Sequence, residues 1–166
     1  MACWKLLQAA LQRKRFCADS TGEFCTRGYS VMKGYWDDAA KTAEAIDADG
    51  WMHTGDVGYL DEDGYLFVVD RLKDMIITGG ENVWSQEVEN ALAAHPAVAL
   101  CAVIGKPDAF WGETVHAIVN LREGMSTDEA ELIAHCRARI APYKCPRSVD
   151  IRAEPLPLSG ANKVMK

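Results

Sequence analysis

The sequence predicts an α+β fold: a small β-rich subdomain followed by a compact α+β domain with a mixed sheet and two main helices. Residues 23–70 contain short β-like runs separated by turn residues. Residues 74–166 read in order as strand, helix, strand, strand, helix and strand. The composition, 49% hydrophobic and 25% charged, is typical of a globular chain with a core. We therefore divide the chain into an amino-terminal segment 1–22 with no predicted part in either fold unit, a β-rich part 23–72 and a domain 73–166.

In the β-rich part, residues 24–26 are expected to be extended. A short alanine-rich helix is expected over 37–46, with Asp37 or Asp38 as its N-cap. Residues 59–60 and 65–69 flank an Asp-Glu-Asp-Gly turn, which predicts a β-hairpin.

In the second domain, a brief strand over 75–78 is followed by the paired glycines Gly79 and Gly80. Ser85 is the expected N-cap of a helix that ends near residue 94. The nearly continuous apolar run 98–104 predicts a strand buried on both faces. Residues 114–121 are expected to form a second strand. Ser126-Thr-Asp-Glu129 matches a capping box for a helix to about residue 140, and 149–152 is the last strand.

The bulk properties exclude several function classes. A net charge of −6 argues against nucleic acid as the main partner. No apolar run approaches the roughly 20 residues that span a bilayer. Six scattered cysteines without a C-x-x-C pair favour a reduced, cytoplasmic compartment, and the four histidines lack ligand spacing, so no metal site is expected.

The first 16 residues hold four bases and no acid, a pattern shared by transit peptides and membrane-surface helices. Serine enrichment and an uninterrupted apolar core are missing. An ordinary terminal helix, or a start codon inside a longer gene, is therefore the preferred interpretation, and a membrane is not an expected partner.

Two charged residues of the β-rich part each have a ligand-binding and a purely structural interpretation. Asp56 follows a glycine at a strand edge, where a carboxylate can accept hydrogen bonds from two vicinal hydroxyls or instead cap a local turn. Arg71 offers a rigid fork of donors to a ribose or phosphate oxygen, or to Asp70 or Asp74.

Several motifs occur in a fixed order: Gly-Glu-Phe-Cys-Thr-Arg-Gly-Tyr-Ser-Val-Met-Lys-Gly-Tyr-Trp, Thr-Gly-Asp, Asp-Arg-Leu-Lys-Asp, Gly-Gly-Glu-Asn-Val, Pro-Tyr-Lys-Cys-Pro-Arg and the segment around Lys163. In this order and spacing the chain resembles the carboxyl-terminal portion of AMP-forming acyl-CoA synthetases, in the fatty or aromatic acyl branch of the adenylate-forming superfamily. The resemblance covers residues 23–166.

The resemblance implies an acyl carboxylate and CoA as substrates, with ATP/AMP and Mg²⁺ as cofactors. It implies that Asp56 and Arg71 contact the AMP ribose. It also implies that Lys73 is the hinge residue about which the family's small carboxyl-terminal domain turns between the two half-reactions. Gly79, Gly80 and Glu81 correspond to a loop that lines the thiol tunnel; a plain hairpin turn is the simpler interpretation of the glycines. The basic residues Lys144 and Arg147 either meet CoA phosphates or form a solvated loop.

Lys163 is the expected catalytic residue. Adenylation brings a carboxylate against the ATP α-phosphate, and an ammonium group between two anions lowers their repulsion. One charge pair at ~4 Å is worth roughly 4 kcal/mol at an effective dielectric near 20. Ser-Gly-Ala-Asn precedes this lysine where the family has Ser-Gly, so Lys166 is the other possible match; Val164-Met165 after Lys163 favours Lys163.

The family's phosphate-binding loop, adenine segment and acyl pocket have no counterpart in the sequence. The first hypothesis is therefore an acyl-CoA ligase piece that is inactive alone. The alternative is a stand-alone binding module that complements or regulates another synthetase. Under either hypothesis, we expect the chain to bind an amino-terminal AMP-binding domain or to associate with itself.

Overall fold

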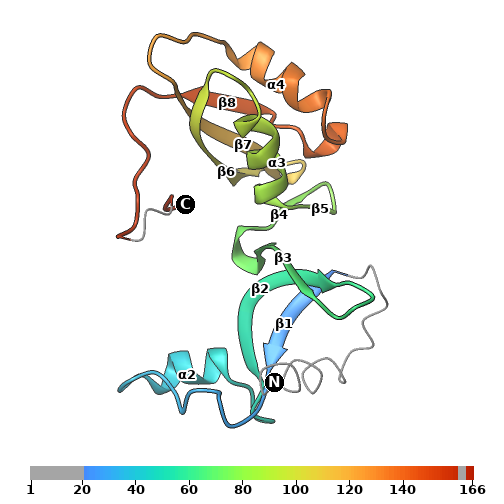
Figure 1. Ribbon diagram of the computed structural model, residues 1–166, viewed down its shortest axis with the longest axis vertical. Coiled ribbons are helices and arrows are strands. Elements are labelled where there is room, and N and C mark those ends of the chain that lie inside the picture. The colour runs from blue at the N-terminus through green and yellow to red at the C-terminus, as the bar shows by residue number, and fades with distance from the viewer. Residues whose placement is uncertain (1–20, 161–163) are drawn as a thin grey trace. The chain divides into compact units, whose positions relative to one another are not determined.

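The computed structural model describes residues 21–160 and 164–166, which form two compact units (Figure 1). The division falls after Lys73, so that the second unit begins at Asp74. The α+β fold class is confirmed, with a three-stranded sheet in the first unit and a five-stranded sheet in the second. Among the described residues, no helix has the length and hydropathy needed to cross a membrane.

The first unit is an antiparallel sheet of order β1–β2–β3, with one short helix. The strands are β1 Gly22–Thr26, β2 Met52–Leu60 and β3 Leu66–Arg71, and the helix is α2 Ala39–Ala45. Asp38 caps α2, because its carboxylate accepts from the Lys41 amide at 2.9 Å. The predicted hairpin is the β2–β3 connection, where the Asp61 carboxylate accepts from the Tyr65 amide at 2.7 Å.

The core of this first unit is small. Among the described residues, its buried hydrophobic side chains are Phe24, Trp51 and Val57. Large side chains lie exposed instead, led by Trp36 at 98% and Tyr29 at 84%. So much exposed aromatic surface is typical of a face that binds another protein part.

Gly58 on β2 packs directly against β3, and we expect Gly58→Ala to destabilise the first unit. A methyl group at this position would overlap the backbone carbonyl oxygen of Phe67 and lie 2.9 Å from the Phe24 ring. Backbone cannot move as a side chain can, so the expected cost is about 1–3 kcal/mol or more. Urea unfolding followed by far-ultraviolet circular dichroism measures it. Gly160→Ala, where a methyl meets nothing within 4 Å, is the control, and equal stability of both variants would contradict the prediction.

The second unit is a mixed sheet of order β5–β4–β7–β6, with β8 paired to β7 in parallel. Its strands are β4 Ile76–Thr78, β5 Glu81–Val83, β6 Val98–Asp108, β7 Gly112–Leu121 and β8 Ser148–Ile151. Its α-helices are α3 Ser85–Ala93 and α4 Glu129–Arg137. Short 3-10 turns, η1 Leu72–Asp74 and η2 Pro142–Lys144, stand before β4 and β8.

Alternate residues of β7 are buried, namely Val115, Ala117 and Val119, as expected for a strand with one face under helices. Leu92 of α3 and Leu132 of α4 are fully buried in the same cluster. One continuous core therefore holds both helices to the sheet.

Two predicted caps were wrong. Ser85 is the first residue of α3 and Trp84 stands at its N-cap without a side-chain bond. Asp128 caps α4 by accepting from the Glu131 amide at 2.8 Å, and Thr127 donates to the Glu131 carboxylate at 2.7 Å. In both helices the N-cap is the residue whose backbone is extended, Trp84 or Asp128, and not the predicted serine.

Candidate functional site

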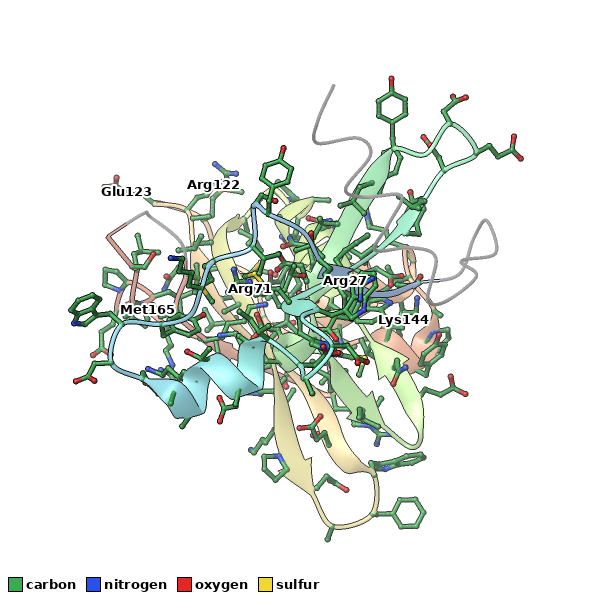
Figure 2. All side chains as sticks on the ribbon, turned by 90° about the horizontal axis from the view of Figure 1, so that it is seen from below. Arg27, Arg71, Arg122, Glu123, Lys144 and Met165 are labelled. Carbon is green, nitrogen blue, oxygen red and sulfur yellow. The ribbon has the colours of Figure 1, made fainter. Side chains whose placement is uncertain are left out.

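Asp56 and Arg71 lie opposite each other on β2 and β3. Asp56 Oδ1 is 3.4 Å from Arg71 Nε, and the two side chains are 38% and 58% exposed. An ion pair this exposed contributes about 0–1 kcal/mol to stability. The pair therefore leaves a carboxylate and a guanidinium side by side and accessible to a ligand; Arg71 is labelled in Figure 2.

Lys73 is exposed in η1, the single turn that follows β3. The boundary between the two compact units lies immediately after it. A charged residue in this place can change its backbone angles without loss of core contacts.

Gly79 and Gly80 form the two-residue turn between β4 and β5, with φ of 58° and 85°. Positive φ at both positions is the geometry that favours glycine in a hairpin. Beneath the turn lies Trp111, whose carbonyl accepts from the Gly79 amide at 2.9 Å. A Cβ at Gly79 would lie 2.8 Å from the Trp111 ring, whereas one at Gly80 meets nothing within 4 Å. Glu81, the next residue, is exposed.

The two basic residues after α4 differ in their contacts. Lys144, labelled in Figure 2, donates to both carboxylate oxygens of Glu87 at 2.9 and 2.7 Å. This hydrogen bonding raises the pKa of Lys144. The Arg147 guanidinium lies 4.4 Å from the centroid of the Trp111 ring. Lys144 thus belongs to an ion pair within the unit, while Arg147 stays exposed beside the Gly79 turn.

Lys163 lies outside the described residues, but its neighbour Lys166 is described. Lys166 Nζ is 2.8 Å from the Glu89 carboxylate and donates to the Ser85 hydroxyl at 2.6 Å. Both charged side chains are largely buried, at 18% and 13% exposure. The Lys166 ammonium group is thus bound to Glu89 and Ser85 within the second unit.

A family model of the AMP-binding enzyme C-terminal domain matches residues 87–163. This part of the chain is an AMP-binding enzyme C-terminal domain. The matched residues include most of α3 and all of β6, β7, α4 and β8, together with Lys144 and Lys163.

Known relatives extend the match to nearly the whole chain. A feruloyl-CoA synthase of Amycolatopsis sp is 51% identical over 87% of this chain and 29% of its own length. A long-chain-fatty-acid–CoA ligase of Bacillus subtilis is 46% identical over 87% of this chain and 26% of its own. The chain spans less than a third of the length of these relatives. Its likeness is to the carboxyl-terminal portion of AMP-forming acyl-CoA synthetases.

Solved structures agree with the AMP-binding C-terminal domain match. ATP-bound MatB from Rhodopseudomonas palustris is 37% identical, with a TM-score of 0.81 over 89% of this chain and 29% of that one. The o-succinylbenzoate-CoA synthetase of Bacillus subtilis, solved with its acyl-adenylate intermediate, is 39% identical with a TM-score of 0.78; the match covers 89% of this chain and 30% of that one.

Sequence reasoning did not find Trp111 or the contacts of His53. Trp111 follows an exposed loop residue and is part of no motif. Its position under Gly79 depends on the pairing of Thr78 with Gly112. His53 shows no ligand spacing in the sequence, yet β1–β2 pairing places Cys25 opposite it. Hydrogen bonding to the Glu23 carboxylate raises the pKa of His53.

Proposed function

We propose that the chain supplies the carboxyl-terminal part of an acyl-CoA ligase, which converts a carboxylate, ATP and CoA into acyl-CoA, AMP and pyrophosphate. The observation that carries the proposal is the exposed Asp56–Arg71 pair across β2 and β3. A carboxylate accepts hydrogen bonds from the two ribose hydroxyls, and the adjacent guanidinium donates to a ribose oxygen.

In this proposal the second unit moves about Lys73 between adenylation and thioester formation. The Gly79–Gly80 turn, with the exposed Glu81 beside it, borders the path of the CoA thiol. Arg147 and Arg137 are the basic groups for the CoA phosphates, and they line a pocket of about 410 Å³. Mg²⁺ enters as the ion bound to the ATP phosphates.

The proposal also holds that the chain does not adenylate a carboxylate alone, because its sequence has no phosphate-binding loop. The exposed aromatic residues of the first unit, with Trp36 the most exposed, favour an amino-terminal AMP-binding domain as its partner. The same surface favours a second candidate function, a binding module that attaches to another synthetase without taking part in the chemistry.

A complementation assay separates these functions. We expect no carboxylate-dependent pyrophosphate release from the purified chain or from a synthetase truncated to its amino-terminal domain, and release from the mixture. Asp56→Ala is expected to lower kcat/KM for ATP about 10–100-fold, the equivalent of one hydrogen bond to a charged group.

Asp63→Ala, at the exposed tip of the β2–β3 hairpin, is the matched control and should keep full activity. Carboxylate-dependent pyrophosphate release by the chain alone would contradict the proposal that it needs a partner domain. Binding without rescue, or rescue that is indifferent to Asp56→Ala, would favour the binding module.

A further inference from the structure

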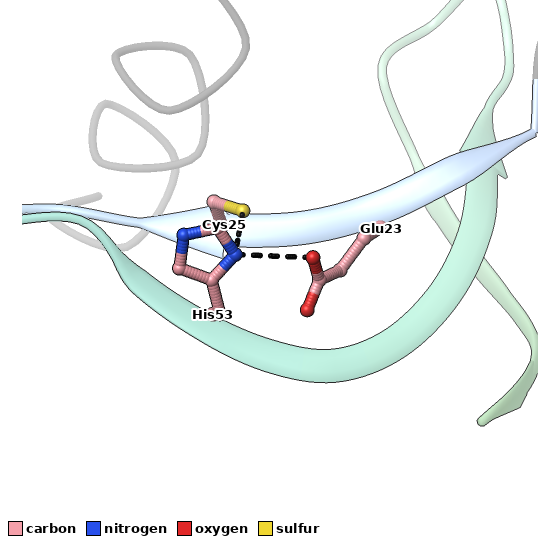
Figure 3. A group of neighbouring side chains, drawn as sticks. All are labelled: Glu23, Cys25 and His53. Carbon is pink, nitrogen blue, oxygen red and sulfur yellow. Dashed lines mark hydrogen bonds and ion pairs between the residues drawn. The ribbon is translucent and has the colours of Figure 1, made fainter. Parts of the chain in front are cut away.

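Glu23, Cys25 and His53 bring three different donor atoms together on the first unit (Figure 3). Glu23 and Cys25 are two residues apart on β1, and Cys25 faces His53 across the β1–β2 pairing. His53 Nδ1 lies 3.4 Å from Cys25 Sγ and 3.1 Å from Glu23 Oε2. All three donor atoms lie within 4.8 Å of one another. A sulfur, a nitrogen and an oxygen thus converge on one point.

The spacing of these atoms fits a tetrahedral ion. Zinc binds cysteine, histidine and carboxylate ligands at about 2.0–2.3 Å, so that tetrahedral ligand atoms stand about 3.3–3.8 Å apart. Two of the three separations, at 3.4 and 3.1 Å, are within a few tenths of an ångström of that range, and the third, between Cys25 and Glu23, is no more than 4.8 Å. Rotation of the Glu23 or Cys25 side chain would bring the third pair into the same range.

The surroundings of the cluster support ligation as well. Asp47 Oδ2 lies 3.7 Å from His53 Nε2, on the side of the ring opposite Cys25 and Glu23. The other Asp47 oxygen accepts from the Asp49 and Trp51 amides at 2.9 Å, which fixes this carboxylate. Histidines that bind metals commonly donate their second ring N–H to such a carboxylate.

We propose that Glu23, Cys25 and His53 bind a thiophilic divalent cation of the zinc class through Oε2, Sγ and Nδ1. Water supplies the fourth ligand, since the His53 side chain is 41% exposed. The Cys25 thiol releases its proton to solvent as the sulfur–metal bond forms. Nδ1 of His53 likewise gives up the proton that it donates to Glu23, so that His53 binds as neutral imidazole with its Nε2–H toward Asp47. Thiolate and imidazole select zinc-like ions over Mg²⁺ and Ca²⁺.

The ion ties β1 to β2 beside the proposed nucleotide pair. Glu23 Oε1 accepts from the Gly55 amide at 3.1 Å, and Gly55 precedes Asp56. A metal that fixes Glu23 therefore fixes the part of β2 that presents Asp56.

Titration of the full chain with Co²⁺, under a phosphine reductant, tests the site. We expect a thiolate-to-cobalt charge-transfer band that saturates at one ion per chain and disappears when Zn²⁺ is added. Cys25→Ser removes the band and His53→Gln weakens binding about 100-fold. Asp47→Asn, which keeps the oxygen that accepts from Asp49 and Trp51, weakens it about tenfold.

Cys101→Ser, a cysteine change on β6, is the matched control and keeps the band. Circular dichroism establishes that each variant is folded; His53→Gln carries the test if Cys25→Ser is not. A folded chain without the band, a band that survives Cys25→Ser, or equal affinity of the wild type and His53→Gln would overturn the proposal. Pyrophosphate release plays no part in this readout, so the metal site and the ligase proposal fail independently.

Discussion

Lys163→Ala is expected to slow carboxylate-dependent pyrophosphate release about a thousandfold in the complemented mixture. The lysine ammonium offsets the repulsion between a carboxylate and the α-phosphate as they approach, an effect of roughly 4 kcal/mol at ~4 Å. With preformed acyl-adenylate and CoA, thioester formation is expected to continue, because no carboxylate meets a phosphate in that step. Separate assays of the two half-reactions measure this difference.

Lys166→Ala is the matched control, and its expected effect is on stability. Removal of this ammonium leaves the Glu89 carboxylate, only 13% exposed, without its partner at 2.8 Å. We expect a loss of about 1–3 kcal/mol in the free energy of unfolding, with adenylation retained under conditions where the chain stays folded. Glu89 still accepts from the Val103 amide at 2.9 Å, which limits the loss. The opposite pattern, in which Lys166→Ala stops adenylation and Lys163→Ala does not, would move the catalytic assignment to Lys166.

Leu92→Ala is expected to destabilise the second unit by about 2–5 kcal/mol. Leu92 has no exposed surface and packs in the cluster that joins α3 to the sheet. Truncation loses the transfer free energy of the side chain and leaves a cavity that the neighbouring strands fill only in part. Urea unfolding followed by near-ultraviolet circular dichroism measures the cost.

The matched control for that substitution is Leu158→Ala. Leu158 is 46% exposed, so the same truncation removes little buried surface. Its expected effect lies within about 0.5 kcal/mol. Similar losses for the two leucine variants would mean that Leu92 does not pack as described.

Hydrophobic periodicity was enough to predict the main elements of the second unit. β7 alternates buried and half-buried residues, and α4 places Leu132 and Cys136 one turn apart on its inner face. The caps were harder, because a serine or threonine near a helix start has several neighbours that fit the same pattern. Ser85 in addition binds Lys166, 81 residues away, and no local pattern contains that contact.

In the candidate site too, local patterns predicted single residues but not the contacts between distant ones. Asp56 and Arg71 were predicted separately, and the β2–β3 pairing explains why they meet. The hydrogen bond from Lys144 to Glu87 joins residues 57 positions apart, and that between His53 and Glu23 joins residues 30 positions apart. Such partners depend on strand register and helix packing, which a single sequence does not reveal.

The unequal cores of the two units have a calorimetric consequence. The described part of the first unit buries Phe24, Trp51 and Val57, whereas thirteen residues form the core cluster of the second. Heat is therefore expected to melt the β1–β3 layer first and the helix-covered sheet later, in two steps of different enthalpy. One melting temperature would then describe neither step, since two-state treatment holds only for a single cooperative body.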